Sequence, residues 1–303
     1  MAERVIDIRG LRKSYGDVEA VRGIDLHVDH GEVFALLGPN GAGKTTTVEI
    51  LEGYRERTDG EISVLGQDPA HAGGDLKGRV GIVLQSTGVD PYLTVRETVD
   101  LYAGYYPSPR DIDEVIDLVG LGEKRTTRVK KLSGGQQRRL DVAVALAGDP
   151  ELLFLDEPTT GFDPNARRNA WGIVKNLADI GKTIFLTTHF MDEAQFLADR
   201  VAVIAKGEIV ADGTPSTIAG RDRMQTRIHF RLPDGKRPAL ELTDGTALED
   251  GSWEIRTDNP TKVAHDLTAW ALERGQVYEV LEITQPSLED VYLELTGGEE
   301  GAE

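Results

Sequence analysis

The chain has 303 residues, which allows one large domain with a smaller one, or two modest domains. Acidic residues outnumber Lys and Arg by 52 to 34, and the formal net charge of −18 argues against the broad basic surface that nucleic-acid binding requires. The sequence contains no cysteine, which excludes a disulfide scaffold and thiol chemistry.

The N-terminal segment has no long apolar core, so it does not have the pattern of a signal peptide. The longest apolar runs, such as residues 33–37 and 151–155, are far shorter than the ~20 residues that a membrane-spanning helix needs. We therefore expect a soluble, cytoplasmic chain that reaches a membrane only through a partner.

Residues 5–220 alternate short apolar stretches with stretches of helical periodicity. This alternation predicts an α/β domain with a largely parallel sheet that is covered on both faces. The predicted strands are residues 33–38, 79–85, 151–157 and 183–189, followed by a hairpin over residues 200–213. The predicted helices are residues 43–53 and residues 111–122, the second with apolar Ile112, Val115, Ile116 and Val119.

After Gly220 the pattern changes to short alternating strands that are separated by turns. The predicted strands are residues 227–232, 239–243, 252–257 and 277–283, and the predicted helices are residues 259–275 and 287–297. Asn259 and Ser287 are the expected N-caps, and Gly297 is the expected stop. We predict a small α+β domain over residues 221–297 and a disordered tail over residues 298–303.

A glycine-rich stretch follows the first predicted strand and opens the next helix. Gly38, Gly43, Lys44 and Thr45 match the spacing of a phosphate-binding loop in the context that this motif requires. Glycines let several backbone N–H groups point at one phosphate, the lysine reaches the β- and γ-phosphates, and the threonine hydroxyl ligates Mg²⁺. The predicted ATP contacts are Gly38, Pro39, Asn40, Gly41, Ala42, Gly43, Lys44, Thr45 and Thr46.

Two acids end the predicted strand over residues 151–157. Asp156 is placed where a carboxylate can help to hold Mg²⁺, and Glu157 is placed to polarise a water for attack on the γ-phosphate. Alone, such a pair is more often a solvated turn. The phosphate-binding loop earlier in the chain favours the functional interpretation.

The stretch Leu132–Gln136, LSGGQ, matches the signature of the ATP-binding subunits of ABC transporters, and the chain resembles this family over about residues 4–220. The resemblance implies that two copies pack head to tail. It also implies that Ser133, Gly134, Gly135 and Gln136 contact the ATP held by the other copy. This explains a second anion-binding turn in a chain that already has a phosphate-binding loop.

Four further residues match motifs of the family in order. By resemblance, Tyr15 stacks on adenine, Gln85 contacts Mg²⁺ and the attacking water, Asp163 crosses the dimer interface, and His189 contacts the γ-phosphate. Each has an ordinary alternative, such as a helix N-cap for Asp163 or a structural histidine for His189. Phe162 stands where the family usually has Leu, which is an apolar-for-apolar change.

The resemblance implies an ABC ATPase cassette over residues 4–220, with a mixed sheet and a helical subdomain, that uses ATP and Mg²⁺. The small domain over residues 221–297 follows it. Residues 280–297 and 80–106 resemble segments of drug-export subunits of the daunorubicin-resistance type. We therefore expect an ATPase that powers export through a separately encoded membrane permease, and a second ATPase copy that is either identical or a paralogue.

The permease is expected to dock on residues 89–98 and to hold the chain at the cytoplasmic face of the membrane. The alternative is a soluble ABC ATPase that acts on ribosomes or DNA. A single cassette, the lack of a long coiled-coil insertion between Thr46 and Leu132, and the acidic charge all count against it. No nucleic-acid partner is expected.

Overall fold

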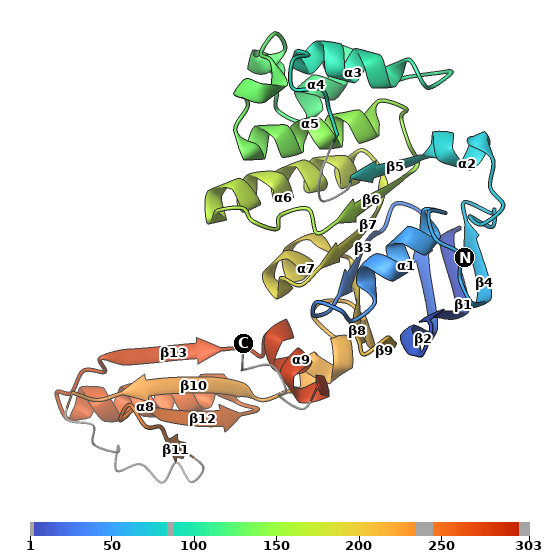
Figure 1. Ribbon diagram of the computed structural model, residues 1–303. Helices are drawn as coiled ribbons and strands as arrows, with labels where there is room; N and C mark the ends of the chain where they lie inside the picture. Colours follow the sequence, from blue (N-terminus) through green and yellow to red (C-terminus); the bar gives the residue numbers. More distant parts are fainter. Residues whose placement is uncertain (1–2, 84–87, 234–244, 297–303) are drawn as a thin grey trace. The chain divides into compact units, whose positions relative to one another are not determined.

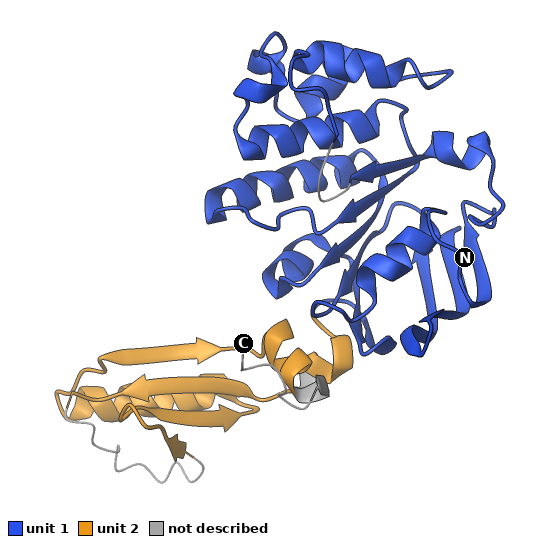
Figure 2. Cartoon of the chain, viewed as in Figure 1, with its two compact units in different colours: residues 1–215 blue, residues 216–303 orange. Residues whose placement is uncertain are grey.

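A computed structural model describes residues 3–83, 88–233 and 245–296 (Figure 1). The chain forms two compact units, residues Met1–Pro215 and Ser216–Glu303 (Figure 2). The division falls a few residues before the domain boundary that we predicted after Gly220. Both units combine helices with strands, and the predicted α/β class is confirmed.

The first unit is built on a six-stranded sheet in the order β5-β6-β7-β3-β8-β9. All neighbouring strands are parallel except β8 and β9, so the sheet is mixed. Its central strands are buried along their whole length, which explains why they read as continuous apolar runs. The strands are β3 (Val33–Leu37), β5 (Val80–Val83), β6 (Leu152–Asp156), β7 (Thr183–Thr188), β8 (Arg200–Ala205) and β9 (Glu208–Gly213).

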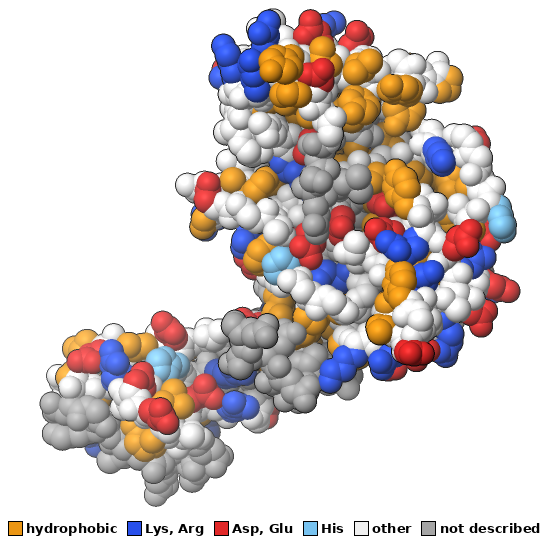
Figure 3. Space-filling model, viewed as in Figure 1, with side chains coloured by type: hydrophobic (Ala, Val, Ile, Leu, Met, Phe, Trp, Pro, Cys, Tyr) orange, Lys and Arg blue, Asp and Glu red, His pale blue; other side chains and the backbone are white. Residues whose placement is uncertain are grey.

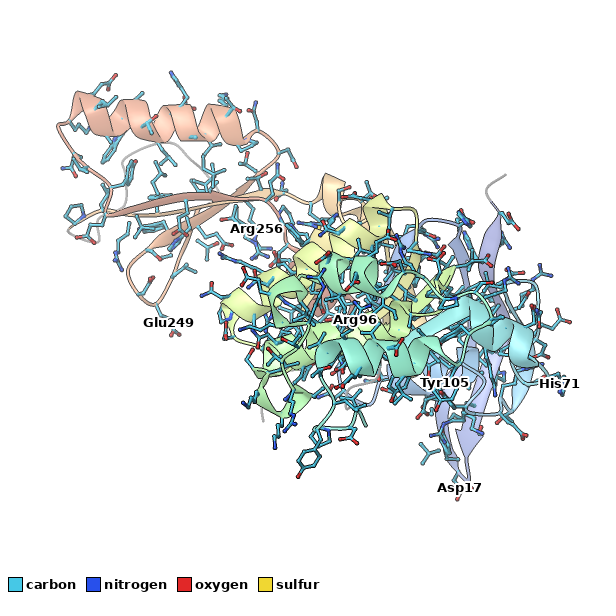
Figure 4. All side chains as sticks on the ribbon, turned by 90° about the horizontal axis from the view of Figure 1, so that it is seen from above. Asp17, His71, Arg96, Tyr105, Glu249 and Arg256 are labelled. Carbon is cyan, nitrogen blue, oxygen red and sulfur yellow. The ribbon has the colours of Figure 1, made fainter. Side chains whose placement is uncertain are left out.

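A second, antiparallel sheet in the order β2-β1-β4 was not predicted. It consists of β1 (Arg4–Tyr15), β2 (Val18–Asp29) and β4 (Asp59–Val64), and Asp17 lies at the tip of the hairpin that joins the first two strands (Figure 4). Apolar side chains of this sheet, of β3 and of helix α1 (Lys44–Leu51) share one core. The N-terminal strands alternate apolar and polar residues because one of their faces is buried.

Among the remaining helices of the first unit, α2, α5 and α7 contact strands of the six-stranded sheet. Three of the remaining helices, α3, α4 and α5, contact one another and form the predicted helical subdomain (Figure 1). The α-helices are α2 (Gly74–Arg79), α3 (Val95–Ala103), α4 (Ile112–Leu118), α5 (Gly134–Leu146), α6 (Pro164–Asp179) and α7 (Met191–Leu197), with short 3₁₀ turns η1 (Gly122–Lys124) and η2 (Val129–Lys131).

The second unit is an antiparallel sheet in the order β11-β12-β10-β13 with helix α8 packed against it. Its own small core contains Ile228, Phe230, Ile255 and Leu267. The elements are η3 (Ile218–Arg223), β10 (Thr226–Arg231), β11 (Gly245–Ala247), β12 (Trp253–Thr257), α8 (Pro260–Glu273), β13 (Val280–Thr284) and α9 (Leu288–Thr296).

Two caps predicted for the second unit are present. The Asn259 side chain accepts a hydrogen bond from Lys262 N–H, and Ser287 and Asp290 cap each other at the start of α9. The strand predicted over residues 239–243, the stop at Gly297 and the tail over residues 298–303 lie outside the described residues. Within the described part of the chain, no helix has the length and apolar character needed to cross a membrane.

Candidate active site

The glycine-rich loop follows β3 and leads directly into α1, as the sequence predicted. Two of its glycines are required by close contacts of the backbone. A Cβ on Gly38 would lie 2.3 Å from the Ile204 carbonyl oxygen, and one on Gly43 would lie 2.6 Å from the Ala20 carbonyl oxygen. Gly43 also has a φ of +109°, which side chains other than hydrogen rarely tolerate. The loop therefore packs closely against β8 and β2.

Lys44 is buried within this loop. Its ammonium donates to the carbonyl oxygens of Gly38, at 2.7 Å, and Pro39, at 3.0 Å. A hollow of about 350 Å³ lies over the loop, and its lining includes Lys44 and Glu157. Asn40, Gly41, Gly43, Thr45 and Thr46 also line it. Cationic and N–H groups thus face a space that an anion can enter.

The topology brings three chain segments to one edge of the sheet. β3, β7 and β6 are parallel neighbours, so their carboxyl ends meet. The loop follows β3, Asp156 ends β6, and His189 follows β7 directly. The carboxyl edge of a parallel sheet is the usual place for ligands in folds of this class. Residues far apart in the sequence are therefore assembled around the hollow.

Side chains from these segments come together around the Glu157 carboxylate. Its Oε1 lies 3.4 Å from Lys44 Nζ and 3.3 Å from His189 Nδ1. Burial raises the pKa of Glu157, but the nearby Lys44 and His189 outweigh it, and the net pKa lies below the ordinary value. The carboxylate is therefore ionised at neutral pH and able to accept a proton.

Asp156 is buried next to Glu157 and pairs across the sheet with Thr187. The Thr187 hydroxyl donates a hydrogen bond to its Oδ1. Burial raises the pKa of Asp156, the bond from Thr187 opposes this, and the net pKa stays above the ordinary value. A carboxylate in this setting would be stabilised by a cation nearby.

The oxygen atoms near the loop are suited to Mg²⁺ that is held jointly by the protein and the phosphates of a nucleotide. The described residues include no group of three or more His, Asp or Glu side chains able to hold a metal by themselves. Mg²⁺ is usually held by one or two protein oxygens together with substrate phosphates. The exposed Thr45 and the buried Asp156 supply donors of that type.

The signature turn begins helix α5. Ser133 and Gln136 form a reciprocal capping box, in which each side chain accepts from the backbone N–H of the other. A Cβ on Gly134 would meet no heavy atom within 4 Å, and one on Gly135 would meet only Ala166, at 3.9 Å. Packing within the chain therefore does not require these glycines. With Asp163 the turn lines a cleft of about 1280 Å³, and Glu157 lines both this cleft and the hollow over the loop.

The other predicted residues are placed as follows. Tyr15 ends β1 with 41% of its surface exposed, and the Arg55 guanidinium lies 5.3 Å from its ring centre. Asp163 caps α6 by accepting from the N–H groups of Asn165 and Ala166, which is the ordinary role considered for it. Gln85 lies outside the described residues.

Thr187 was not singled out from the sequence. Besides binding Asp156, its hydroxyl and its carbonyl oxygen both accept from the Glu157 N–H, at 3.1 and 3.2 Å. The signal that could have identified it is a pair of threonines at the end of a buried strand, just before a histidine. Its partner could not be identified without the strand register.

Comparisons with known proteins agree with this geometry. A family model described as "ABC transporter" matches residues 21–160, and one described as "ABC transporter domain-containing protein-like, C-terminal domain" matches residues 226–287. The Nod factor export ATP-binding protein I of Burkholderia pseudomallei (strain 1710b) is 38% identical, with 99% of each chain covered. The daunorubicin/doxorubicin resistance ATP-binding protein DrrA of Streptomyces peucetius is 37% identical, with 97% of this chain and 93% of the relative covered.

Solved structures show the same fold for the first unit. The protein cbiO1 of Clostridium perfringens, part of the ABC transporter complex cbiONQ, is 28% identical with a TM-score of 0.64, covering 71% of this chain and 90% of its own. The ATP-binding cassette MJ0796, in a dimeric post-hydrolysis state bound to ADP and Pi, is 25% identical with a TM-score of 0.61, covering 69% and 98%. The resemblance predicted from the sequence is confirmed: the chain belongs to the ABC transporter family and is one of its ATP-hydrolysing, ATP-binding subunits.

Proposed function

We propose that this subunit binds Mg²⁺-ATP in the hollow over residues 38–46 and works as a pair of ATPase copies to power a separate membrane permease that exports a small compound. One observation carries the proposal. Lys44 and His189, from two different segments, both lie within 3.4 Å of Glu157 Oε1, at the edge where the phosphate-binding loop meets β6 and β7.

The chemistry assigned to this arrangement is attack of water on the γ-phosphate. The Glu157 carboxylate accepts a proton from the water as its oxygen bonds to phosphorus, and the bond from phosphorus to the β-phosphate oxygen breaks to release ADP. Lys44 neutralises charge on the phosphates, and His189 contacts the γ-phosphate. Thr45 and Asp156, with Gln85, would hold Mg²⁺, which when bound neutralises charge on the β- and γ-phosphates.

The signature turn supports a second copy in the working unit. Gly134 and Gly135 leave their surroundings open, so a phosphate from another molecule can approach the backbone there. The turn also opens a helix of thirteen residues, whose N-terminus favours negative charge. In the proposed dimer, residues Ser133 to Gln136 of one copy contact the ATP that is held by the loop of the other copy. Tyr15 stacks on the adenine, and Asp163 lies at the dimer interface. Closure is then a population shift driven by ATP.

We assign the docking surface for the permease to residues 89–98 and to α3. Three large apolar side chains are exposed on this segment, on α3 and just after α3: Tyr92, Leu101 and Tyr105, with 66, 52 and 76% of their surfaces accessible. Figure 3 shows hydrophobic side chains gathered over α3, and Figure 4 labels Tyr105 beside this helix. Exposed aromatic and aliphatic groups of this kind mark protein–protein contacts. Docking there would hold the subunit at the cytoplasmic face of the membrane.

We assign export as the direction of transport, with a small, drug-like or otherwise hydrophobic compound as the substrate. The full-length relatives are named for Nod factor export and for daunorubicin/doxorubicin resistance. The first name states export and the two names differ in compound, so export carries over to the proposal and the compound does not.

Copurification tests the assignment. The chain is tagged in its native cells, extracted from membranes in mild detergent with Mg²⁺ and ATP, and its stoichiometric partners are identified. We expect one integral membrane protein with several spans, and ATPase activity that rises when the two are reconstituted together. Recovery with ribosomes or DNA, and no membrane partner, would contradict the proposal.

A further inference from the structure

Arg138 lies in the second turn of α5, shortly after the signature turn, and its side chain is only 10% exposed. Its Nε donates to the carbonyl oxygen of Pro158 at 3.3 Å, and its Nη2 donates to that of Asp156 at 3.2 Å. These two carbonyls belong to the residues on either side of Glu157. One guanidinium therefore holds the chain just before and just after the carboxylate.

The backbone of Glu157 needs such support. Its φ is +45°, in the left-handed region that residues with a Cβ rarely adopt. Conformations of this kind persist where the surroundings hold them, and they gather at functional sites. On one side, the Glu157 N–H is bound to Thr187 of β7. On the other, Arg138 of α5 holds the flanking carbonyls, so the segment is fixed between a strand and a helix.

Arginine is suited to this contact and lysine is not. The planar guanidinium presents Nε–H and an Nη2–H side by side, and these reach two acceptors at once. The charge is buried, and Asp141 Oδ2 lies 3.8 Å from Nη1. Burial lowers the pKa of Arg138 and the nearby carboxylates oppose this. The side chain nevertheless stays protonated at any ordinary pH.

We propose that Arg138 is a positioning residue for hydrolysis, which holds the peptide groups around Glu157 so that its carboxylate points into the hollow over the loop. Because α5 begins at the signature turn, the same contact ties the base of one ATP site to the helix that reaches the other site. This inference rests on the proposed role of Glu157 as the base.

Steady-state kinetics of the full-length protein test it with Arg138→Lys, which keeps the charge and loses the two-pronged donor. We expect kcat to fall by about tenfold or more and the KM for ATP to change by no more than about twofold. The matched control is Arg57→Lys. Arg57 makes a two-pronged contact with Asp68 and is 20% exposed, so its replacement affects stability without lowering kcat.

A double-mutant cycle separates positioning from general damage. If Arg138 acts through Glu157, adding Arg138→Lys to Glu157→Gln lowers the residual rate no further. An equal fold loss in both backgrounds, or an unchanged kcat in Arg138→Lys, overturns the inference. Normal activity of Glu157→Gln would instead overturn the proposed base.

Hydrogen exchange gives a readout that does not depend on turnover. In Arg138→Lys, amides of residues 152–163 should exchange faster, while those of β1 and β2 keep their rates. Unchanged exchange in residues 152–163 counts against the inference. If the lysine variant does not fold, Arg138→Gln, which keeps neutral N–H donors, is measured in the same way with the same outcomes.

Discussion

Lys44 Nζ lies 3.4 Å from Glu157 Oε1, and both side chains are buried, at 4% and 10% exposure. The ion pair joins the first residue of α1 to the turn that follows β6. A buried pair is costly to break from one side, because the remaining charge is left without a partner. The lysine assigned to the phosphates thus helps to keep the glutamate ionised.

Glu157→Gln should separate ATP binding from turnover. The change keeps the shape of the side chain but removes its ability to accept a proton, so we expect kcat to fall by about 10²–10⁴-fold. ATP binding should remain, and the dimer should accumulate with Mg²⁺ and ATP in size-exclusion chromatography. Glu208→Gln, at an exposed position of β9, is the control and should behave like the wild type. A Glu157→Gln protein that stays monomeric and hydrolyses ATP normally would contradict the assignment.

Two inactive variants should restore activity when they are mixed. Lys44→Ala removes the cation from the loop, and Gly134→Asp places a carboxylate where the other copy's phosphate would approach. Each homodimer then has two broken sites, whereas a mixed dimer has one intact site. An equal mixture should reach at most about a quarter of wild-type activity, since about half of the dimers are mixed.

Gly134→Ala is the control for this experiment, because a Cβ there meets no heavy atom within 4 Å and the fold is unaffected. Full activity of Gly134→Asp on its own would rule out a role for the turn at the phosphate. Enzyme-coupled phosphate release at several mixing ratios provides the measurement.

Glu52 should make the stability of the protein depend on pH. Burial, with the nearby Asp156 and Glu49 carboxylates, raises its pKa from 4.5 to about 8, and Oε1 is shielded from solvent without a hydrogen-bond partner among the described residues. When folding raises the pKa of a group, its contribution to the free energy of unfolding is fully present below the pKa of the unfolded state. This contribution is lost as the pH rises through the pKa of the folded state. Relative to Glu52→Gln, the wild type should therefore lose stability between about pH 4.5 and pH 8.

Each pKa unit corresponds to about 1.4 kcal/mol, and with allowance for partial solvent screening we expect a loss on the order of 2 kcal/mol in total. Thermal unfolding of both proteins from about pH 5 to about pH 9, without nucleotide and with a chelator, measures the difference. Glu56→Gln, at an exposed neighbouring position, should track the wild type at every pH. A difference between wild type and Glu52→Gln that does not change with pH would disprove the prediction.

A chain that ends at Pro215 should still bind ATP. The loop, Lys44, Asp156, Glu157 and His189 all belong to the first unit, and the second unit has its own core. Our hypothesis is that the second unit supports assembly with the permease or with the second copy, since the relatives that include it are full-length export subunits. The shortened protein should bind a fluorescent ATP analogue with near-normal affinity yet fail to support transport in membranes that carry the permease.

Monodispersity of the shortened protein is checked first, because newly exposed apolar surface causes aggregation. A monodisperse chain that binds ATP, assembles and transports like the full protein would show that the second unit has no part in assembly.

Local features were predictable because they depend on a few neighbouring residues. Gly43 before Lys44 and Thr45 specifies a loop that enters a helix, and Asp163 or Asn259 before a proline specifies a helix start. The buried strands β3, β6 and β7 were predicted because a parallel sheet that is covered on both faces needs continuous apolar runs. The antiparallel sheet of β1, β2 and β4 was not predicted, because the local sequence pattern does not indicate which strands pair with one another.

By itself, the sequence determined the family and the glycine-rich loop that leads into a helix, and it singled out the acids and the histidine to which we assign hydrolysis. Tertiary structure decided which of these groups meet. The distance from Lys44 to Glu157, the bond from Thr187 to Asp156 and the contact of Arg138 with the carbonyls around Glu157 all arise from strand order and helix packing. The left-handed backbone at Glu157 belongs to the same class, because hydrogen bonds from β7 and α5 help to offset its local cost.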